Sequence, residues 1–124
     1  MSSEIDEVIK QKQLMPFGEL VDKVIDQHQK TDTIDNLDMR VILTRIVKPL
    51  KPFDNDEVER LIDGIHPNQL QQMSLINLVL LEHNVTERWI KKYEKFVIDW
   101  NVVLDHQKIS DEYIVELKLK GLVE

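Results

Sequence analysis

The 124-residue chain contains no cysteine and only three glycines, at positions 18, 64 and 121. Without cysteine it can form neither a disulfide nor a thiolate metal site, and this composition fits a reducing compartment. Three isolated glycines cannot build the glycine-rich loops that hold nucleotide phosphates. We therefore expect an intracellular protein, in the cytoplasm or nucleus, that needs no cofactor.

Long apolar runs are also missing. The chain has no apolar stretch of the roughly eighteen residues that a membrane span requires. Its first twenty residues mix charged side chains with apolar ones, which predicts no signal peptide. We expect no contact with a membrane.

The residue patterns that catalysis and metal binding require are absent as well. The four histidines, at positions 28, 66, 83 and 106, lack the short spacing by which one helix offers two imidazoles to zinc. No serine lies in a nucleophile-elbow pattern, although paired carboxylates stay possible because pairing depends on the fold. We expect no catalytic residue, no metal site and no small-molecule ligand, so the chain is predicted not to be an enzyme.

The net charge of −7 is unevenly distributed. Residues 39–53 carry four Lys or Arg and no acid, residues 54–87 carry one base against seven acids, and residues 88–108 return to a net charge of +2. An acidic chain repels polyanions overall, which disfavours nucleic-acid binding as its main task. The expected partner is a protein.

What the sequence does contain is helical periodicity. The longest apolar stripe at helical spacing runs from Thr86 to Leu104 and includes both tryptophans, which we expect to be core anchors, with a groove-lining role open for one of them. Further helical patterns cover 17–30, 37–50, 54–64, 67–81 and 110–120, and one more precedes Pro16. Because such helices must bury their apolar sides against each other, the sequence predicts an all-α, compact single-domain bundle of about five to seven helices. Its core would span about 17–105, with peripheral helices at 1–15 and 108–124.

Three local features sharpen this expectation. The 67–81 helix is apolar nearly all round, which predicts the central, most enclosed element. Gly64 fits a left-handed position that ends the helix before it. Residues 110–120 alternate like a strand, but Ser110 resembles a helix start and Gly121 a helix end, and we favour a helix.

A basic face accompanies the aromatic stripe, formed by Arg88, Lys91, Lys92 and Lys95. One interpretation is a solvated face with Glu87 and Glu94 as local partners. The other is a docking strip for an acidic peptide.

Two stretches point to a family. Ile34–Asp38 reads as a turn followed by a helix start, and Asn84–Thr86 leads into the pattern from Trp89 to Trp100. Together they resemble the helical domain at the N-terminus of the elongation factor TFIIS and its relatives, which include the integrase-binding domain of a chromatin-tethering coactivator. The two stretches frame a little over half of the chain.

The resemblance implies a non-enzymatic module that grips short disordered motifs of transcription or chromatin factors. It assigns Ile34 and Asp35 to one contact turn, with Asp35 accepting hydrogen bonds from partner backbone amides, and Val85 to a second turn. This chain departs from the integrase-binding domain at Leu78–Glu82, where apolar residues and an acid replace basic residues.

These observations favour a protein-interaction adaptor whose partner-binding residues are Ile34, Asp35, Val85, Arg88 and Lys92. Two alternatives stay open at this point. The chain can be a structural subunit of a larger assembly, with its first helix or the 110–123 segment docked on a neighbour. It can also be a small phage or bacterial regulator that binds polymerase or replication proteins.

Overall fold

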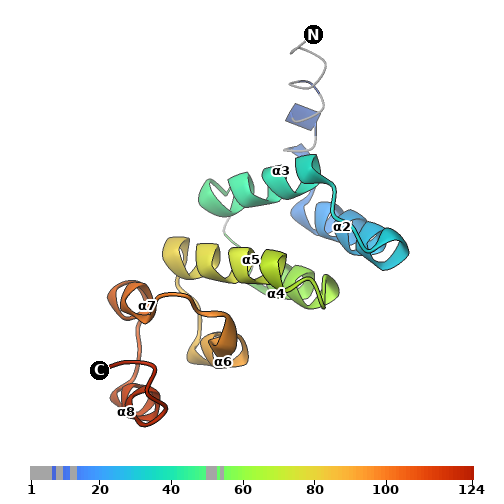
Figure 1. Cartoon of the computed structure of the whole chain (residues 1–124). Helices are drawn as coiled ribbons and strands as arrows, with labels where there is room; N and C mark the ends of the chain where they lie inside the picture. The colour runs from blue at the N-terminus through green and yellow to red at the C-terminus, as the bar shows by residue number, and fades with distance from the viewer. Residues whose placement is uncertain (1–6, 8–9, 12–13, 50–52, 54) are drawn as a thin grey trace. The chain divides into compact units, whose positions relative to one another are not determined.

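The computed structural model describes residues 7, 10–11, 14–49, 53 and 55–124, and all regular structure in these residues is helical (Figure 1). In chain order the helices are α2 (Phe17–Thr31), α3 (Asn36–Val47), α4 (Asn55–Gly64), α5 (Gln69–Glu82), α6 (Glu87–Lys92), the 3-10 helix η1 (Glu94–Phe96), α7 (Trp100–His106) and α8 (Asp111–Leu119). The prediction of an all-α fold with about five to seven helices is confirmed. Most of the helix expected at 1–15 lies outside the described residues.

The chain packs as two compact units, one ending at Leu75 and the other beginning at Ile76. The boundary falls inside α5. We call them the N-terminal unit and the C-terminal unit. The single domain with a core at 17–105 and peripheral helices at 1–15 and 108–124 stays a prediction.

In the N-terminal unit, α2 packs against both α3 and α4. Their aliphatic faces form a core of fully buried side chains, among them Leu20, Val24, Ile42 and Leu61. At the edge of this core, Arg60 of α4 is tied to α2, because its guanidinium pairs with Asp22 and donates to the Gly18 carbonyl at 3.1 Å.

Gly64 has a different role from the one expected. It is the last residue of α4 and does not adopt a left-handed conformation. A Cβ atom at Gly64 would lie 2.6 Å from Cγ1 of Ile25 on α2. Glycine is therefore needed at this point because two helices approach closely, and not because the chain turns.

α5 begins at Gln69, two residues after the expected start, and Asn68 caps it: Oδ1 of Asn68 accepts from the amide of Gln71 at 3.3 Å. The helix is also less enclosed than expected. Leu70 and Leu81 are 78% and 45% exposed, although Leu75, Ile76, Val79 and Leu80 are buried.

In the C-terminal unit the longest predicted helix is wrong, because the apolar stripe from Thr86 to Leu104 is not one helix. It consists of α6, η1 and α7, with Val97 extended at φ −68° and ψ 125°. The interruption is stabilised from α5: the Asn77 side chain donates to the Phe96 carbonyl at 2.8 Å and accepts from the Ile98 amide at 3.0 Å. Asp99 then caps α7 by accepting from the Asn101 amide at 2.9 Å.

The helix favoured for residues 110–120 is confirmed as α8. Ser110 caps its start by accepting from the Tyr113 amide at 3.2 Å. Gly121 ends it in the left-handed region at φ 74°. The amides of Gly121 and Leu122 donate to the carbonyls of Lys118 and Leu117, both at 3.0 Å, which is the Schellman arrangement.

Candidate functional site

The residues of the first expected contact turn lie in the N-terminal unit. The Asp35 carboxylate is the N-cap of α3 and accepts from the amides of Leu37 at 2.8 Å and Asp38 at 3.1 Å. The Asp35 amide donates to the Gln27 side chain at 3.3 Å, and Ile34 beside it is partly buried. Asp35 thus stabilises its own helix, and its contact with a partner stays a prediction.

The other expected residues lie in the C-terminal unit. The amide of Val85 donates to Oε1 of Gln107 at 2.9 Å. Nε2 of the same side chain donates to the carbonyls of Leu80 at 2.8 Å and His83 at 2.6 Å, so Gln107 fixes the turn between α5 and α6. Arg88 and Lys92 are exposed and lie one turn apart on α6.

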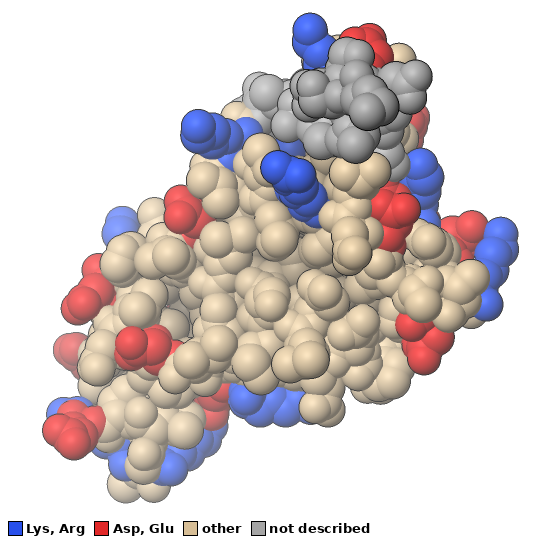
Figure 2. Space-filling model, turned by 45° about the horizontal axis from the view of Figure 1, so that its top comes forward, with Lys and Arg blue, Asp and Glu red and all other residues tan. Residues whose placement is uncertain are grey.

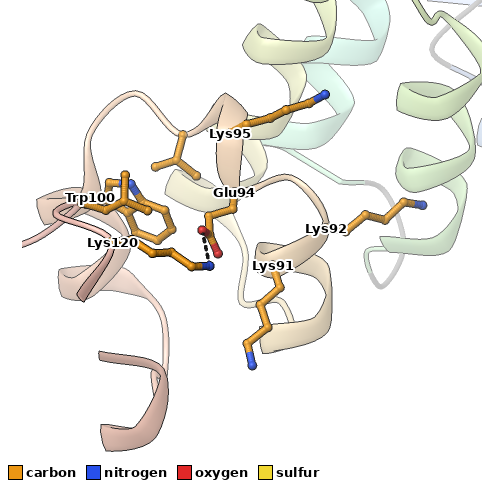
Figure 3. Close-up of a pocket in the computed structure, with 8 residues that line it drawn as sticks. Lys91, Lys92, Glu94, Lys95, Trp100 and Lys120 are labelled. Atoms are coloured by element: carbon orange, nitrogen blue, oxygen red, sulfur yellow. Dashed lines mark hydrogen bonds and ion pairs between the residues drawn. The ribbon is translucent and has the colours of Figure 1, made fainter. Parts of the chain in front are cut away.

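Beside α6 the C-terminal unit has a pocket of about 590 Å³ whose lining combines lysines with apolar side chains (Figure 3). We call it the lysine pocket. It is lined by Lys91, Lys92, Glu94, Lys95, Val97, Trp100, Lys120 and Leu122. Of the residues expected to bind a partner, Lys92 lines this pocket, and Ile34, Asp35, Val85 and Arg88 do not.

Three local structures position the apolar side of the pocket. The α7 cap places Trp100 at the start of that helix, where its ring meets Tyr113 edge to face at 6.4 Å. The bend after η1 brings Val97 into the lining. The Schellman turn at the end of α8 brings Leu122 back to the same place. Trp100 is buried, with 8% of its surface exposed, so it is the core anchor that the sequence predicts and its ring also forms part of the pocket wall.

Glu94 is the acidic residue of the lysine pocket. Its carboxylate accepts from Nζ of Lys120 at 2.8 Å (Figure 3). It also accepts from the hydroxyl of Tyr113 at 2.9 Å. Burial by itself raises the pKa of Glu94, but the hydrogen bonds from Lys120 and Tyr113 outweigh it and hold the pKa below its ordinary value. The hydrogen bond from Lys120 in turn raises the pKa of that ammonium group. Glu94 therefore stays ionised and joins η1 to the end of α8.

The ammonium groups of the other three lysines lie over aromatic rings. Lys91 lies 4.9 Å from the ring centre of Tyr113, Lys92 lies 5.2 Å from that of Tyr93, and Lys95 lies 5.1 Å from that of Phe96. Lys91 is also 3.8 Å from Glu116. In Figure 3 the side chains of Lys92 and Lys95 point to the same side, away from Glu94, and that of Lys91 points another way. They spread positive charge along a surface and do not converge on one point.

Sequence reasoning found half of this pocket. Lys91, Lys92 and Lys95 share a helical face in the sequence pattern, which indicated a basic strip. Lys120 and Leu122 were missed, since they reach the pocket through the turn at Gly121. Their approach depends on packing between α8 and η1, which no local pattern encodes.

Other site classes find little support. No group of three or more His, Asp or Glu side chains within the described ranges is arranged to hold a metal ion. Among the residues that the structure places, no helix combines the length and apolar character that a membrane crossing needs. On the face drawn in Figure 2 basic and acidic side chains are both present around the edge, so neither sign dominates it. Comparison with known proteins finds no family model, no curated protein and no solved structure that matches the chain.

Proposed function

We propose that this chain is a non-enzymatic protein-interaction module, and that the lysine pocket of its C-terminal unit binds a short acidic segment of a partner protein. The observation that carries the proposal is a pocket whose lining combines four lysines with Trp100, Val97 and Leu122. The pocket joins residues of α6 and η1 to Lys120 and Leu122, which follow α8, so its shape depends on the folded unit.

The charge pattern supports an extended acidic chain over a small anion. A lysine ammonium is a compact point charge on a flexible stem, and it contributes through electrostatic attraction more than through fixed geometry. The ammonium groups of Lys91, Lys92 and Lys95 lie over three different aromatic rings and so are separate points of charge, which suits several carboxylates along a peptide. The apolar wall next to them gives the partner's own apolar atoms a surface to bury.

The proposed setting in transcription or chromatin has a separate basis. It rests on the resemblance of Ile34–Asp38 and of the stretch from Asn84 to Trp100 to the TFIIS N-terminal family. The partner contacts of Ile34, Asp35 and Val85 belong to the same proposal. The lysine pocket does not depend on either.

Both tryptophans lie in the C-terminal unit, which allows a direct binding test. A synthetic peptide of alternating glutamate and serine, free of aromatic residues, is titrated into the full chain, and tryptophan fluorescence reports on Trp100 in the pocket wall. The test variant replaces Lys91, Lys92 and Lys95 with glutamine together. The matched control makes the same change at Lys23, Lys30 and Lys48, which are exposed lysines of the N-terminal unit.

We expect saturable binding by the wild type and by the control, and a loss of affinity of about tenfold or more in the pocket variant, because each lost charge pair weakens a surface contact modestly and three are lost. Equal losses in both variants would overturn the proposal, since they would reduce the effect to net charge. So would an absence of saturation in the wild type.

A second candidate function is that of a subunit in a larger assembly. Val115 and Leu119 are 55% and 84% exposed and lie one turn apart on α8, so this helix has an apolar outer face. Analytical ultracentrifugation of the wild type and of a Val115→Ser, Leu119→Ser variant tests this candidate. Self-association that the variant abolishes supports a subunit, and a monomer at all concentrations removes a role in self-assembly.

A further inference from the structure

A second, apolar cavity opens in the C-terminal unit beyond the lysine pocket. It has a volume of about 180 Å³ and is lined by Asn77, Leu80, Leu81, Ile98, Asp99, Val102 and Val103. We call it the apolar pocket. Two of its lining side chains, Ile98 and Leu81, are 70% and 45% exposed. An apolar cavity of about 150 Å³ can hold a benzene molecule, so this one suits a single leucine or phenylalanine side chain.

The two pockets share the short segment between η1 and α7. Val97 lines the lysine pocket, whereas the next two residues, Ile98 and Asp99, line the apolar pocket. This segment is held in place because the Asn77 side chain donates to the Phe96 carbonyl and accepts from the Ile98 amide, so both pockets belong to one fixed structure.

We propose that the two pockets form one bipartite docking surface for an acidic peptide that carries a single large apolar residue. The acidic residues of the peptide lie along Lys91, Lys92 and Lys95, and its apolar side chain enters the apolar pocket between Leu81 and Ile98. This inference rests on the proposed function and names the partner's chemistry more closely.

Charge complementarity selects this occupant over a bare apolar surface. An apolar side chain alone can enter any exposed cavity of this size, but the lysines of the adjoining pocket favour one that is flanked by carboxylates. Asp99 is a lining residue of the apolar pocket and disfavours a second carboxylate there, which directs the acidic part of the peptide to the lysine pocket.

The test compares two peptides on the full chain. One is the alternating glutamate and serine peptide, and the other is the same peptide with one central serine replaced by leucine. The variant of the apolar pocket is Leu81→Ser with Ile98→Ser, both at exposed positions where folding is little affected. The matched control is the Val115→Ser, Leu119→Ser variant, which changes two exposed apolar residues outside both pockets.

We expect the leucine to raise affinity about tenfold on the wild type and on the control, because burying such a side chain is worth about that much or more. On the apolar-pocket variant the gain disappears, while the affinity of the all-polar peptide is unchanged. On the lysine variant both peptides bind weakly.

The possible failures can be told apart. If the all-polar peptide does not bind the wild type, the proposed function falls with the inference. If it binds and the leucine adds nothing, or adds equally to the apolar-pocket variant, the inference alone is overturned. Concentration-dependent self-association that is lost in the Leu81→Ser, Ile98→Ser variant would instead assign the apolar pocket to a second copy of the chain.

Discussion

The N-terminal unit is built from long helices and the C-terminal unit from short ones. α2, α3 and α4 have 15, 12 and 10 residues, whereas α6, α7 and α8 have 6, 7 and 9. Helices this short are marginal in water by themselves. The C-terminal unit must therefore gain its order from tertiary contacts.

Those contacts differ in kind between the two units. The core of the N-terminal unit is mainly aliphatic, but that of the C-terminal unit includes four buried aromatic rings, those of Trp89, Tyr93, Trp100 and Tyr113. Side-chain amides add to them, since Gln107 and Asn77 satisfy backbone groups where helices are interrupted. The comparison teaches that a polar side chain can replace a turn of helix, provided that it pairs with the exposed backbone.

The largest expected effect comes from removing one core residue in each unit. Trp89→Ala should cost about 3–5 kcal/mol and Leu61→Ala about 2–5 kcal/mol, because each leaves a cavity in a buried site. Urea unfolding is followed by circular dichroism and by tryptophan fluorescence, which reports on the C-terminal unit. We expect Leu61→Ala to shift the dichroism transition while the fluorescence transition stays in place. Coincident shifts of both signals in both variants would mean that the units unfold as one.

The next largest loss of stability should follow from replacing a buried side-chain amide. Gln107→Met should cost about 3 kcal/mol, because it leaves three backbone groups without their partner. The matched change Gln72→Met in the N-terminal unit should cost about 1 kcal/mol, since Gln72 donates one hydrogen bond, to the Ile62 carbonyl at 2.8 Å. Chemical denaturation measures both. Equal costs would contradict a special dependence of the C-terminal unit on side-chain amides.

The helix caps should behave alike in the two units. Asp35→Ala and Ser110→Ala should each cost about 1 kcal/mol, because each removes an acceptor for amides of the first helical turn. Asp35→Asn should leave the thermal midpoint nearly unchanged, since asparagine caps about as well. A loss for Asp35→Asn as large as that for alanine would show that the charge of Asp35, and not its capping, stabilises α3.

The smallest expected effect is the pH dependence of the stability that the Glu94 carboxylate contributes. Its pKa in the folded chain lies below the ordinary value of 4.5, so its ionised form stabilises the fold at pH values above 4.5. This contribution is lost as the pH falls through the lowered pKa. We expect the difference in unfolding free energy between wild type and Glu94→Gln to shrink on acidification below pH 4.5, as fluorescence-monitored denaturation can show. A difference that stays constant across this range would remove the stabilising role of the carboxylate.

Several elements could be predicted because their causes are local. Ser110 and Gly121 bracket α8, and the helix forms between them despite its strand-like alternation. The interruption between α6 and α7 was missed, although Asp99 in front of Trp100 is a recognisable cap. The apolar stripe continues through Val97 and Ile98, so periodicity alone could not show it.

The lysine pocket likewise combines residues that the sequence predicts with residues that only packing brings to it. Lys91, Lys92 and Lys95 follow from helical spacing, but the pocket also needs Lys120 and Leu122. The role of Gly64 was also beyond prediction from local sequence. Its small size allows the close approach of Ile25, which lies far from it in the sequence.

By itself the sequence determined the all-α class, the caps that start α6 and α8, and the basic residues of α6, because each depends on residues within a few positions of one another. Only the tertiary structure decided where the aromatic stripe breaks and which side chains surround Trp100. The break depends on Asn77, which is 19 residues before Phe96, and the pocket on the ion pair between Glu94 and Lys120, which are 26 residues apart. The physical reason is that such contacts form only once packing has brought distant segments together.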